Sequence, residues 1–264
     1  MTPLLKDSIV WEIISGIEDS FPEIKAIIAQ LHCDAFLVGG YFRDGINGNI
    51  GRDIDIILAC PSSLIEECLN DNFLNYTKNH FGGFKVLLSR DVDLWSIDDN
   101  WAFKEGVVPI GRNLLHSIAK GCFYNYDSLV LNLNTGKYDV YYYQEFIANN
   151  VLDLVNLNSD YILKNPSLYS NLFRAFYIQS LTNCSFSSRL SKYLSYLLED
   201  IIGSDPEAIS RILIKMREYC KYDPQRLLPM IQRWYINSFA SRDVCCLPFE
   251  NINSQLELQL ELAF

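Results

Sequence analysis

The chain has 264 residues, of which 49% are apolar and 20% are charged, and these proportions are typical of a folded globular protein. They exclude an intrinsically disordered chain, and the length is sufficient for one large domain or two modest ones. The net charge of −10 argues against a surface that is basic throughout and coats nucleic acid, but it is compatible with a local basic groove.

Export and membrane signals are missing from the sequence. It has no run of about 18 uncharged apolar residues, so no transmembrane helix is predicted. The amino terminus contains scattered acidic residues and no small-residue cleavage site, unlike a secretory signal. The eight cysteines form neither C-x-x-C nor a Cys/His cluster with zinc spacing. We therefore expect a reduced, cytoplasmic protein whose cysteines act mostly as small apolar residues.

The amino half alternates helix and strand patterns. Helical spacing of apolar residues covers 7–31, residues 41–46 are expected to form a short helix or turn, and a helix of about ten residues follows Pro61. Residues 125–139 are predicted to form a hairpin with its turn at 134–136. Short apolar strands are predicted over residues 36–38, 54–59, 84–88 and 92–96.

The carboxy half has helical apolar spacing from about residue 150. Asp205-Pro206 and Asp223-Pro224 are predicted helix starts, with proline at the first helical position. The predicted fold class is therefore α/β (α+β). A small mixed sheet with helices is expected over residues 1–150, followed by an all-helical domain over residues 151–264.

Asp53 and Asp55 are two apart on a predicted strand, so their side chains project from the same face. Two carboxylates on one face repel each other unless a cation lies between them, and a hard divalent cation with phosphate oxygens in its shell meets this need. Asp93, in the segment VDLW, is placed to add a third carboxylate from a neighbouring strand. The alternative is a D-x-D pair that caps a strand at the surface.

Gly39-Gly40 follows a strand and precedes a short helix. Such a turn lets a phosphate approach backbone N–H groups, although a plain tight turn is the alternative. Neither G-x-G-x-x-G nor G-x-x-x-x-G-K-[ST] is present, so the Rossmann and P-loop folds lack their motifs.

Together, the residues LVGGYFRDGINGNIGRDIDI resemble the head signature of the CCA-adding enzymes and bacterial poly(A) polymerases, in the polymerase-beta nucleotidyltransferase superfamily. That signature reads LVGG-x-VRD-x-LLG, a short gap, and D-x-D. VDLWS resembles the strand with the family's third carboxylate, residues 123–138 resemble the R-R-D-F-T-I-N-A-L region, and NPSLYSNLFRAFYIQSL resembles the neck helix. The resemblance covers roughly residues 33–185 and is strongest over 36–58.

The resemblance implies a two-metal nucleotidyltransferase that uses ATP or CTP with Mg²⁺ or Mn²⁺, and it implies a role for each matching residue. The catalytic residues and metal ligands would be Asp53, Asp55 and Asp93. The triphosphate would lie at Gly39, Gly40 and Arg43, with Asp44 orienting Arg43. Arg174 would survive from the neck helix as a nucleotide contact, and Arg52 would meet a phosphate or be a solvated surface side chain. Arg112 and Lys120 are candidates to replace the family's missing arginines at the triphosphate, with solvated charges as the alternative.

Departures from the family pattern leave the acceptor open. R-R-D-F-T-I-N-A-L has become KGCFYNYDSL, in which Asp127 falls near the family's Asn, and the neck helix lacks E-D-x-x-R. The chain also ends before the body and tail of the full-length enzymes, which indicates a truncated, divergent relative. The family favours an RNA acceptor and tRNA processing. Acidic charge, short length and the lost E-D-x-x-R favour a protein or small-molecule acceptor, while the eroded second motif favours a catalytically silent nucleotide- or protein-binding module.

A few residues have simpler interpretations. The three histidines are expected to be surface or packed side chains, and Asp98 and Asp99 are expected to be turn residues before Trp101. The segment 81–85 (FGGFK) is predicted to be a turn entering a strand, with Lys85 as a further candidate for contact with the nucleotide.

Overall fold

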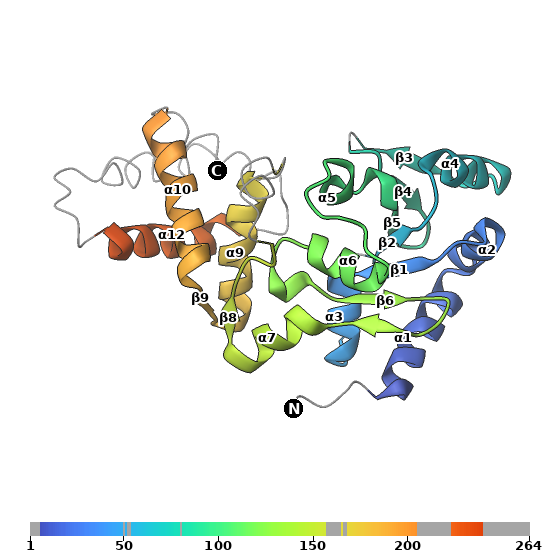
Figure 1. The fold of residues 1–264 in the computed structure, drawn as a ribbon, viewed down its shortest axis with the longest axis horizontal. Helices are drawn as coiled ribbons and strands as arrows, with labels where there is room; N and C mark the ends of the chain where they lie inside the picture. The colour runs from blue at the N-terminus through green and yellow to red at the C-terminus, as the bar shows by residue number, and fades with distance from the viewer. Residues whose placement is uncertain are drawn as a thin grey trace. The chain divides into compact units, whose positions relative to one another are not determined.

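The computed structural model describes residues 6–49, 51, 54–79, 81–156, 165, 168–204 and 223–239. The chain divides into two compact units, both drawn in Figure 1. Unit 1 comprises Met1–Asn149 and Asp153–Asn165, and unit 2 comprises Asn150–Leu152 and Pro166–Phe264. None of the helices in the described ranges is long and apolar enough to cross a membrane.

Unit 1 is built on a seven-stranded mixed sheet with the strand order β3-β4-β5-β2-β1-β6-β7. β2 and β5 are parallel, and the other neighbouring strands are antiparallel. The α/β fold class is therefore confirmed. The strands are β1 Ala35–Val38, β2 Ile54–Leu58, β3 Tyr76–Lys78, β4 Phe84–Leu87, β5 Asp91–Ser96, β6 Val130–Asn132 and β7 Tyr138–Asp139.

Helices of unit 1 surround this sheet. They are α1 Asp7–Ser20, α2 Pro22–Leu31, α3 Gly40–Ile46, α4 Ser62–Asp71, α5 Trp101–Lys104, α6 Leu114–Gly121 and α7 Tyr141–Asn149, with 3₁₀ turns at Ile97–Asp99 (η1) and Asn125–Asp127 (η2). The helical spacing over 7–31 resolves into two helices because Pro22 has no N–H to continue α1 and instead begins α2.

In β2 and β5, one face of the sheet is mainly apolar because successive side chains along a strand point to opposite sides. Ile54, Ile56 and Leu58 of β2 and Val92 and Leu94 of β5 are each at most 1% exposed. Val92 and Leu94 therefore point into the core, on the side opposite to Asp93.

The opposite face holds a second cluster, in which Phe36 and Ile57 of the sheet pack against Ile118 and Ala119 of α6. By the same alternation, Asp55 and Asp93 belong to this second face, and both are partly buried. α6 therefore helps to cover the face of the sheet that holds the carboxylates.

The predicted hairpin over 125–139 begins later than expected. Only Val130 onward is strand, while Asn125–Asp127 is the 3₁₀ turn η2. The physical reason is that Asn125 is tied to Asp153: its N–H donates to the Asp153 carbonyl at 3.0 Å and its Oδ1 accepts from the Asp153 N–H at 3.0 Å. The short strand β3 and the helices α5, α6 and α7 were not predicted.

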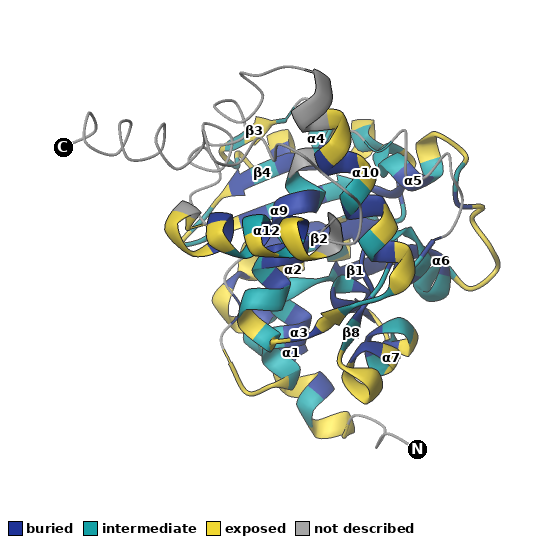
Figure 2. Ribbon diagram, turned by 90° about the vertical axis from the view of Figure 1, so that its left-hand side faces the viewer, coloured by how far each residue is buried: buried dark blue, intermediate teal, exposed yellow. Residues whose placement is uncertain are grey.

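Unit 2 combines a two-stranded parallel sheet with helices. Its described elements are β8 Val151–Leu152, β9 Ser185–Phe186, α9 Leu168–Thr182, α10 Ser188–Ser204 and α12 Pro224–Phe239. An aromatic cluster joins three of them, with ring centroids of Phe176 and Phe186 5.3 Å apart and those of Phe176 and Trp234 5.8 Å apart. Figure 2 shows that α12 has a buried and an exposed side.

The predicted helix start at Asp223-Pro224 is confirmed, because α12 begins at Pro224 and Asp223 Oδ1 accepts a hydrogen bond from the Gln225 N–H at 3.0 Å. The predicted start at Asp205-Pro206 lies outside the described residues.

Candidate functional site

The site begins where β1 ends. Gly39 has φ 69° and ψ −127°, a backbone conformation that favours glycine. Its N–H donates to the Leu129 carbonyl at 3.1 Å, and its carbonyl accepts from the Arg43 N–H at 3.1 Å. A Cβ at Gly39 would meet no atom within 4 Å. The turn into α3 is therefore fixed by its backbone while the space beside Gly39 stays open.

Asp55 and Asp93 lie directly opposite each other on the parallel strands β2 and β5. Val38, the last residue of β1, is the partner of Asp55 on the other side. Directly paired residues share a face, and neighbouring strands are about 4.8 Å apart. The two carboxylates and the end of β1 therefore lie together on the three central strands of the sheet, next to the Gly39-Gly40 turn.

Lys85 continues this row on β4, where it is the partner of Asp93. Its Nζ also forms a 2.9 Å ion pair with Asp91 Oδ2. The turn before it confirms the predicted turn entering a strand: Asn79 Oδ1 accepts from the Gly83 N–H at 3.0 Å, and a Cβ at Gly83 would lie 2.6 Å from Trp95. A positive charge thus stands next to the two carboxylates.

The carboxylate pair fits a hard divalent cation. Two carboxylates on adjacent strands offer oxygen ligands from one face, and their like charges favour a cation between them. Asp53, the third predicted ligand, lies outside the described residues, as does Arg52. Among the residues that the structure describes, no group of three or more His, Cys, Asp and Glu side chains is arranged to hold a metal ion.

The guanidinium of Arg43 lies next to Gly40. Its residue is 8% exposed, and a Cβ at Gly40 would lie 3.6 Å from its Nη2. Nη1 donates to Asp127 Oδ1 at 2.9 Å and Nη2 to Asp44 Oδ1 at 3.2 Å, while the guanidinium lies 4.3 Å from the centre of the Tyr126 ring. Two carboxylates and an aromatic face thus fix this cation.

A second layer supports Arg43. The Tyr126 ring packs on Phe146 of α7 with centroids 5.0 Å apart. Asn47 Nδ2 donates to the Arg43 carbonyl at 2.8 Å and to Tyr143 Oη at 3.4 Å. These contacts join α3, η2 and α7. The pairing of Asp127 with Arg43 was not predicted from the sequence. The feature that could have suggested it is the acidic side chain of Asp127 at a position close to the Asn of the R-R-D-F-T-I-N-A-L motif.

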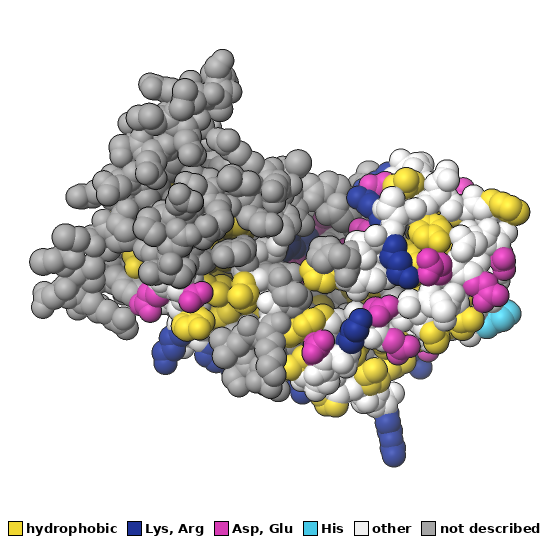
Figure 3. Space-filling model, turned by 90° about the horizontal axis from the view of Figure 1, so that it is seen from above, with side chains coloured by type: hydrophobic (Ala, Val, Ile, Leu, Met, Phe, Trp, Pro, Cys, Tyr) yellow, Lys and Arg dark blue, Asp and Glu magenta, His cyan; other side chains and the backbone are white. Residues whose placement is uncertain are grey.

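The remaining predicted cations are spread over both units. Arg112 is exposed before α6, and Lys120 is partly buried near the end of α6. Arg174 belongs to α9 in unit 2, with its guanidinium 5.7 Å from the centre of the Tyr177 ring. On the face in Figure 3, basic and acidic side chains are interspersed over the described surface. The structure therefore places Arg112 and Lys120 in the same unit as Asp55 and Asp93, and Arg174 in the other.

The histidines were predicted to be surface or packed side chains, and this prediction did not include the contacts of His116. His116 Nδ1 lies 3.0 Å from Asp139 Oδ2, and its ring stacks on Tyr142 at 5.8 Å. Asp98 and Asp99 both lie in the 3₁₀ turn η1, which comes just before Trp101, as predicted for turn residues.

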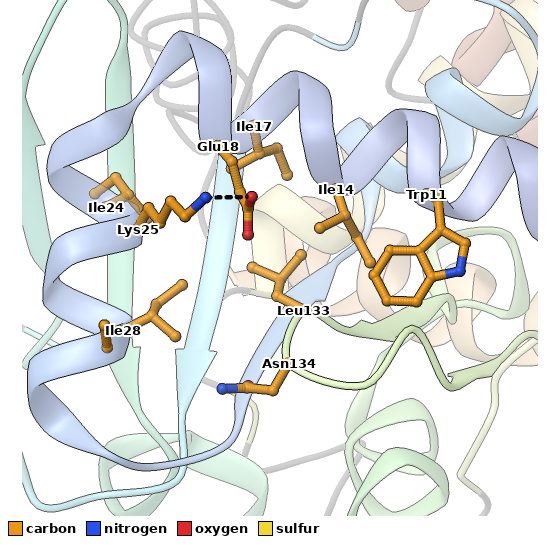
Figure 4. A pocket seen from close by; sticks show the side chains of 10 residues that line it. Trp11, Ile14, Ile17, Glu18, Ile24, Lys25, Ile28, Leu133 and Asn134 are labelled. Atoms are coloured by element: carbon orange, nitrogen blue, oxygen red, sulfur yellow. Dashed lines mark hydrogen bonds and ion pairs between the residues drawn. The ribbon is translucent and has the colours of Figure 1, made fainter.

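A separate cavity of about 270 Å³ lies between α1, α2 and the end of β6 (Figure 4). Ile14, Ile24 and Leu133 line it, and the 2.8 Å ion pair of Lys25 with Glu18 lies at its edge. Leu133 alternates with Asn132, which pairs with Phe36, so it points to the face opposite Asp55. This cavity is therefore not part of the carboxylate site.

Comparison with protein-family models and with curated proteins finds no match to the sequence. Comparison with solved structures does. A CCA-adding enzyme in complex with ATP has a TM-score of 0.61 at 13% identity, over 91% of this chain and 57% of that enzyme. The chain has the fold of the CCA-adding enzymes.

Two further structures agree. The Thermotoga maritima CCA-adding enzyme complexed with tRNA has a TM-score of 0.61 at 13% identity, over 90% of this chain and 57% of that one. A tRNA nucleotidyltransferase complexed with a primer tRNA and an incoming ATP analogue has a TM-score of 0.57 at 15% identity, over 84% and 63%. The match spans about three fifths of the length of these three enzymes.

Proposed function

We propose that this protein is a metal-dependent nucleotidyltransferase that moves a nucleoside monophosphate from a nucleoside triphosphate to the hydroxyl of an RNA 3′ end, most simply that of tRNA. The observation that carries the proposal is the pairing of Asp55 with Asp93 on neighbouring strands, beside the Gly39-Gly40 turn. The same elements lie within the fold of the CCA-adding enzymes, structures of which contain CTP, ATP or tRNA.

Asp55 and Asp93, together with Asp53, would hold Mg²⁺ or Mn²⁺. When bound, such ions neutralise charge on the triphosphate and make an acceptor hydroxyl a better nucleophile. Asp93 would receive the proton of that hydroxyl. The hydroxyl oxygen bonds to the α-phosphorus while the bond from that phosphorus to the bridging oxygen breaks, and pyrophosphate leaves.

Other residues would position the nucleotide, since phosphoryl-type transfer depends mostly on positioning and on neutralising charge. The open side of Gly39 admits the triphosphate, and Arg43 supplies a fixed cation next to Gly40. Arg52, Arg112 and Lys120 would add positive charge, and unit 1 would serve as the head domain. Unit 2 would serve as the neck and body, and Arg174 of α9 would be a further nucleotide contact.

A protein or small molecule is the second candidate acceptor. The net charge of −10 disfavours a long clamped RNA, and the segment that forms α9 contains no E-D-x-x-R. In this case the carboxylate site and its chemistry would be unchanged, and only the hydroxyl donor would differ.

The test is incubation of the protein with α-labelled ATP or CTP, Mg²⁺ and tRNA lacking its 3′-terminal CCA, in parallel with total cell protein. We expect label on the RNA. Label on protein or small molecules alone would contradict the RNA acceptor. Nucleotide that binds without transfer to any acceptor would contradict the enzyme assignment and leave a nucleotide-binding module.

A further inference from the structure

Two cysteines face each other just beyond the ends of β1 and β2. In this antiparallel pair Ala35 is the partner of Leu58. The Ala59 N–H donates to the Asp34 carbonyl at 2.9 Å, which extends the ladder by one residue pair. Continuing the register by one more pair places Cys33 opposite Cys60.

The direction of the backbone groups shows which kind of pair this is. Successive residues of a strand direct their N–H and C=O groups to opposite neighbours. The Asp34 carbonyl bonds toward β2, whereas the Cys33 carbonyl accepts from Asn134 Nδ2, beyond β6, at 3.4 Å. Cys33 and Cys60 therefore occupy a non-hydrogen-bonded position, where opposed Cα atoms are about 4.5 Å apart. A disulfide needs a separation of about 4.4–6.8 Å.

The thiols differ in their surroundings. Cys33 is partly exposed, whereas Cys60 is only 6% exposed, and both are free. Burial raises the pKa of the Cys60 thiol to about 12, and a side-chain hydrogen bond with Cys33 adds to the shift. The ladder register thus places the two cysteines opposite each other, and Cys33 is the more exposed of the two.

We propose that Cys33 and Cys60 form a reversible disulfide site that closes under a peroxide oxidant. Peroxide would convert the Cys33 thiol to a sulfenic acid with release of water. The Cys60 sulfur would then bond to the Cys33 sulfur, displacing the hydroxyl, which leaves as a second water with the Cys60 proton. Two thiols lose two electrons and two protons in total, and one peroxide becomes two waters.

The bond would join the same two strands that hold the Gly39-Gly40 turn and Asp55 at their other end. A cross-link between residues 33 and 60 restricts the unfolded chain, so oxidation would raise the Tm. This inference does not depend on nucleotidyl transfer, because it concerns only the β1–β2 ladder.

The test uses the purified full chain, treated with hydrogen peroxide, blocked with an alkylating reagent and digested with trypsin and a Glu-specific protease. Cleavage after Glu66 and Glu67 separates Cys60 from Cys68. We expect a cross-linked peptide pair containing Cys33 and Cys60, which disappears on reduction. A Cys33 linked instead to Cys68, or a Cys33 oxidised to sulfinic acid without any cross-link, would overturn the proposal.

Variants give a second readout. Peroxide should raise the Tm of the wild type and of Cys184→Ser, whose cysteine lies in unit 2, and dithiothreitol should reverse the rise. Cys33→Ser alters the partly exposed partner and should abolish the rise while keeping the fold. A peroxide-induced rise that persists in Cys33→Ser would contradict the site.

Discussion

Arg43 and Asp127 form a 2.9 Å ion pair between residues 84 apart in the sequence, and it joins the helix after the glycine turn to the 3₁₀ turn η2. The side chains are 9% and 22% exposed, so water screens this pair little. Asp44 and Tyr126 complete the surroundings of the guanidinium. The position of the cation next to Gly40 therefore depends on an acidic residue far along the chain.

Removing one partner of the Arg43–Asp127 pair should lower the free energy of unfolding by more than removing one partner of an exposed ion pair. Asp127→Ala leaves Arg43 with a poorly compensated buried charge, and we expect it to lower the unfolding free energy by about 3 kcal/mol. Urea denaturation measures the change. Glu66→Gln breaks an exposed pair with Lys78, whose side chains are 38% and 43% exposed, and should cost less than about 1 kcal/mol. Equal losses in the two variants would contradict the buried role of Asp127.

Gly39→Ala isolates the conformation of the turn. A Cβ at Gly39 meets nothing within 4 Å, so the only expected penalty is the strain of alanine at a φ of 69°. We expect this strain to lower the free energy of unfolding by about 1–3 kcal/mol. The control is Gly16→Ala in the middle of α1, where a Cβ also meets nothing within 4 Å and alanine should stabilise the helix by about 0.5–1 kcal/mol. Thermal or urea unfolding compares the signs, and a stabilising Gly39→Ala would refute the strained turn.

Unit 2 should lose stability above about pH 10. Burial raises the pKa of Tyr193 above its ordinary value, so the unfolded state releases this proton first as the pH rises. The stabilising contribution is complete below about pH 10 and decreases above it, by up to about 1.4 kcal/mol per pH unit. Tyr193→Phe should flatten this dependence in urea titrations at high pH.

The matched control for Tyr193 lies on the same helix. Tyr196 of α10 is 54% exposed, and Tyr196→Phe should leave the pH dependence of the unfolding free energy as in the wild type. A slope that changes equally in both variants would show that burial of Tyr193 is not its cause.

Metal binding should be visible without catalysis. A ligand that binds only the folded state raises the Tm, so Mg²⁺ should stabilise the wild type. Asp55→Asn and Asp93→Asn each remove a ligand and one of two repelling charges. They should fold with unchanged or higher Tm in a chelator but lose the Mg²⁺-induced rise. A rise that survives both substitutions would place the metal elsewhere.

Much of this fold could be predicted because the features concerned are formed by residues that are close together in the sequence. Two apolar strands, the glycines between β1 and α3, and the same-face spacing of Asp53 and Asp55 needed no knowledge of the rest of the chain. The segment VDLW suggested Asp93 as a third carboxylate, but its register opposite Asp55 depends on β5 pairing with β2, a contact between distant segments.

What local patterns did not predict has a physical cause in each case. β3 is three residues long at the edge of the sheet and partly exposed, so it shows little apolar alternation. Asn125 belongs to a strand-like run, yet its hydrogen bonds to Asp153 turn the backbone into η2. The ion pair of Asp127 with Arg43 likewise arises only when η2 packs next to α3, and the facing positions of Cys33 and Cys60 depend on the register of β1 with β2.

The most direct measurement is the rate at which α-labelled nucleotide is transferred to tRNA lacking its 3′-terminal CCA, compared among four proteins with Mg²⁺ present. We predict transfer by the wild type and by Asp98→Asn, whose carboxylate is exposed in η1. Asp55→Asn and Asp93→Asn should be folded and inactive. Wild-type rates in either of these two variants would contradict a catalytic centre built on Asp55 and Asp93.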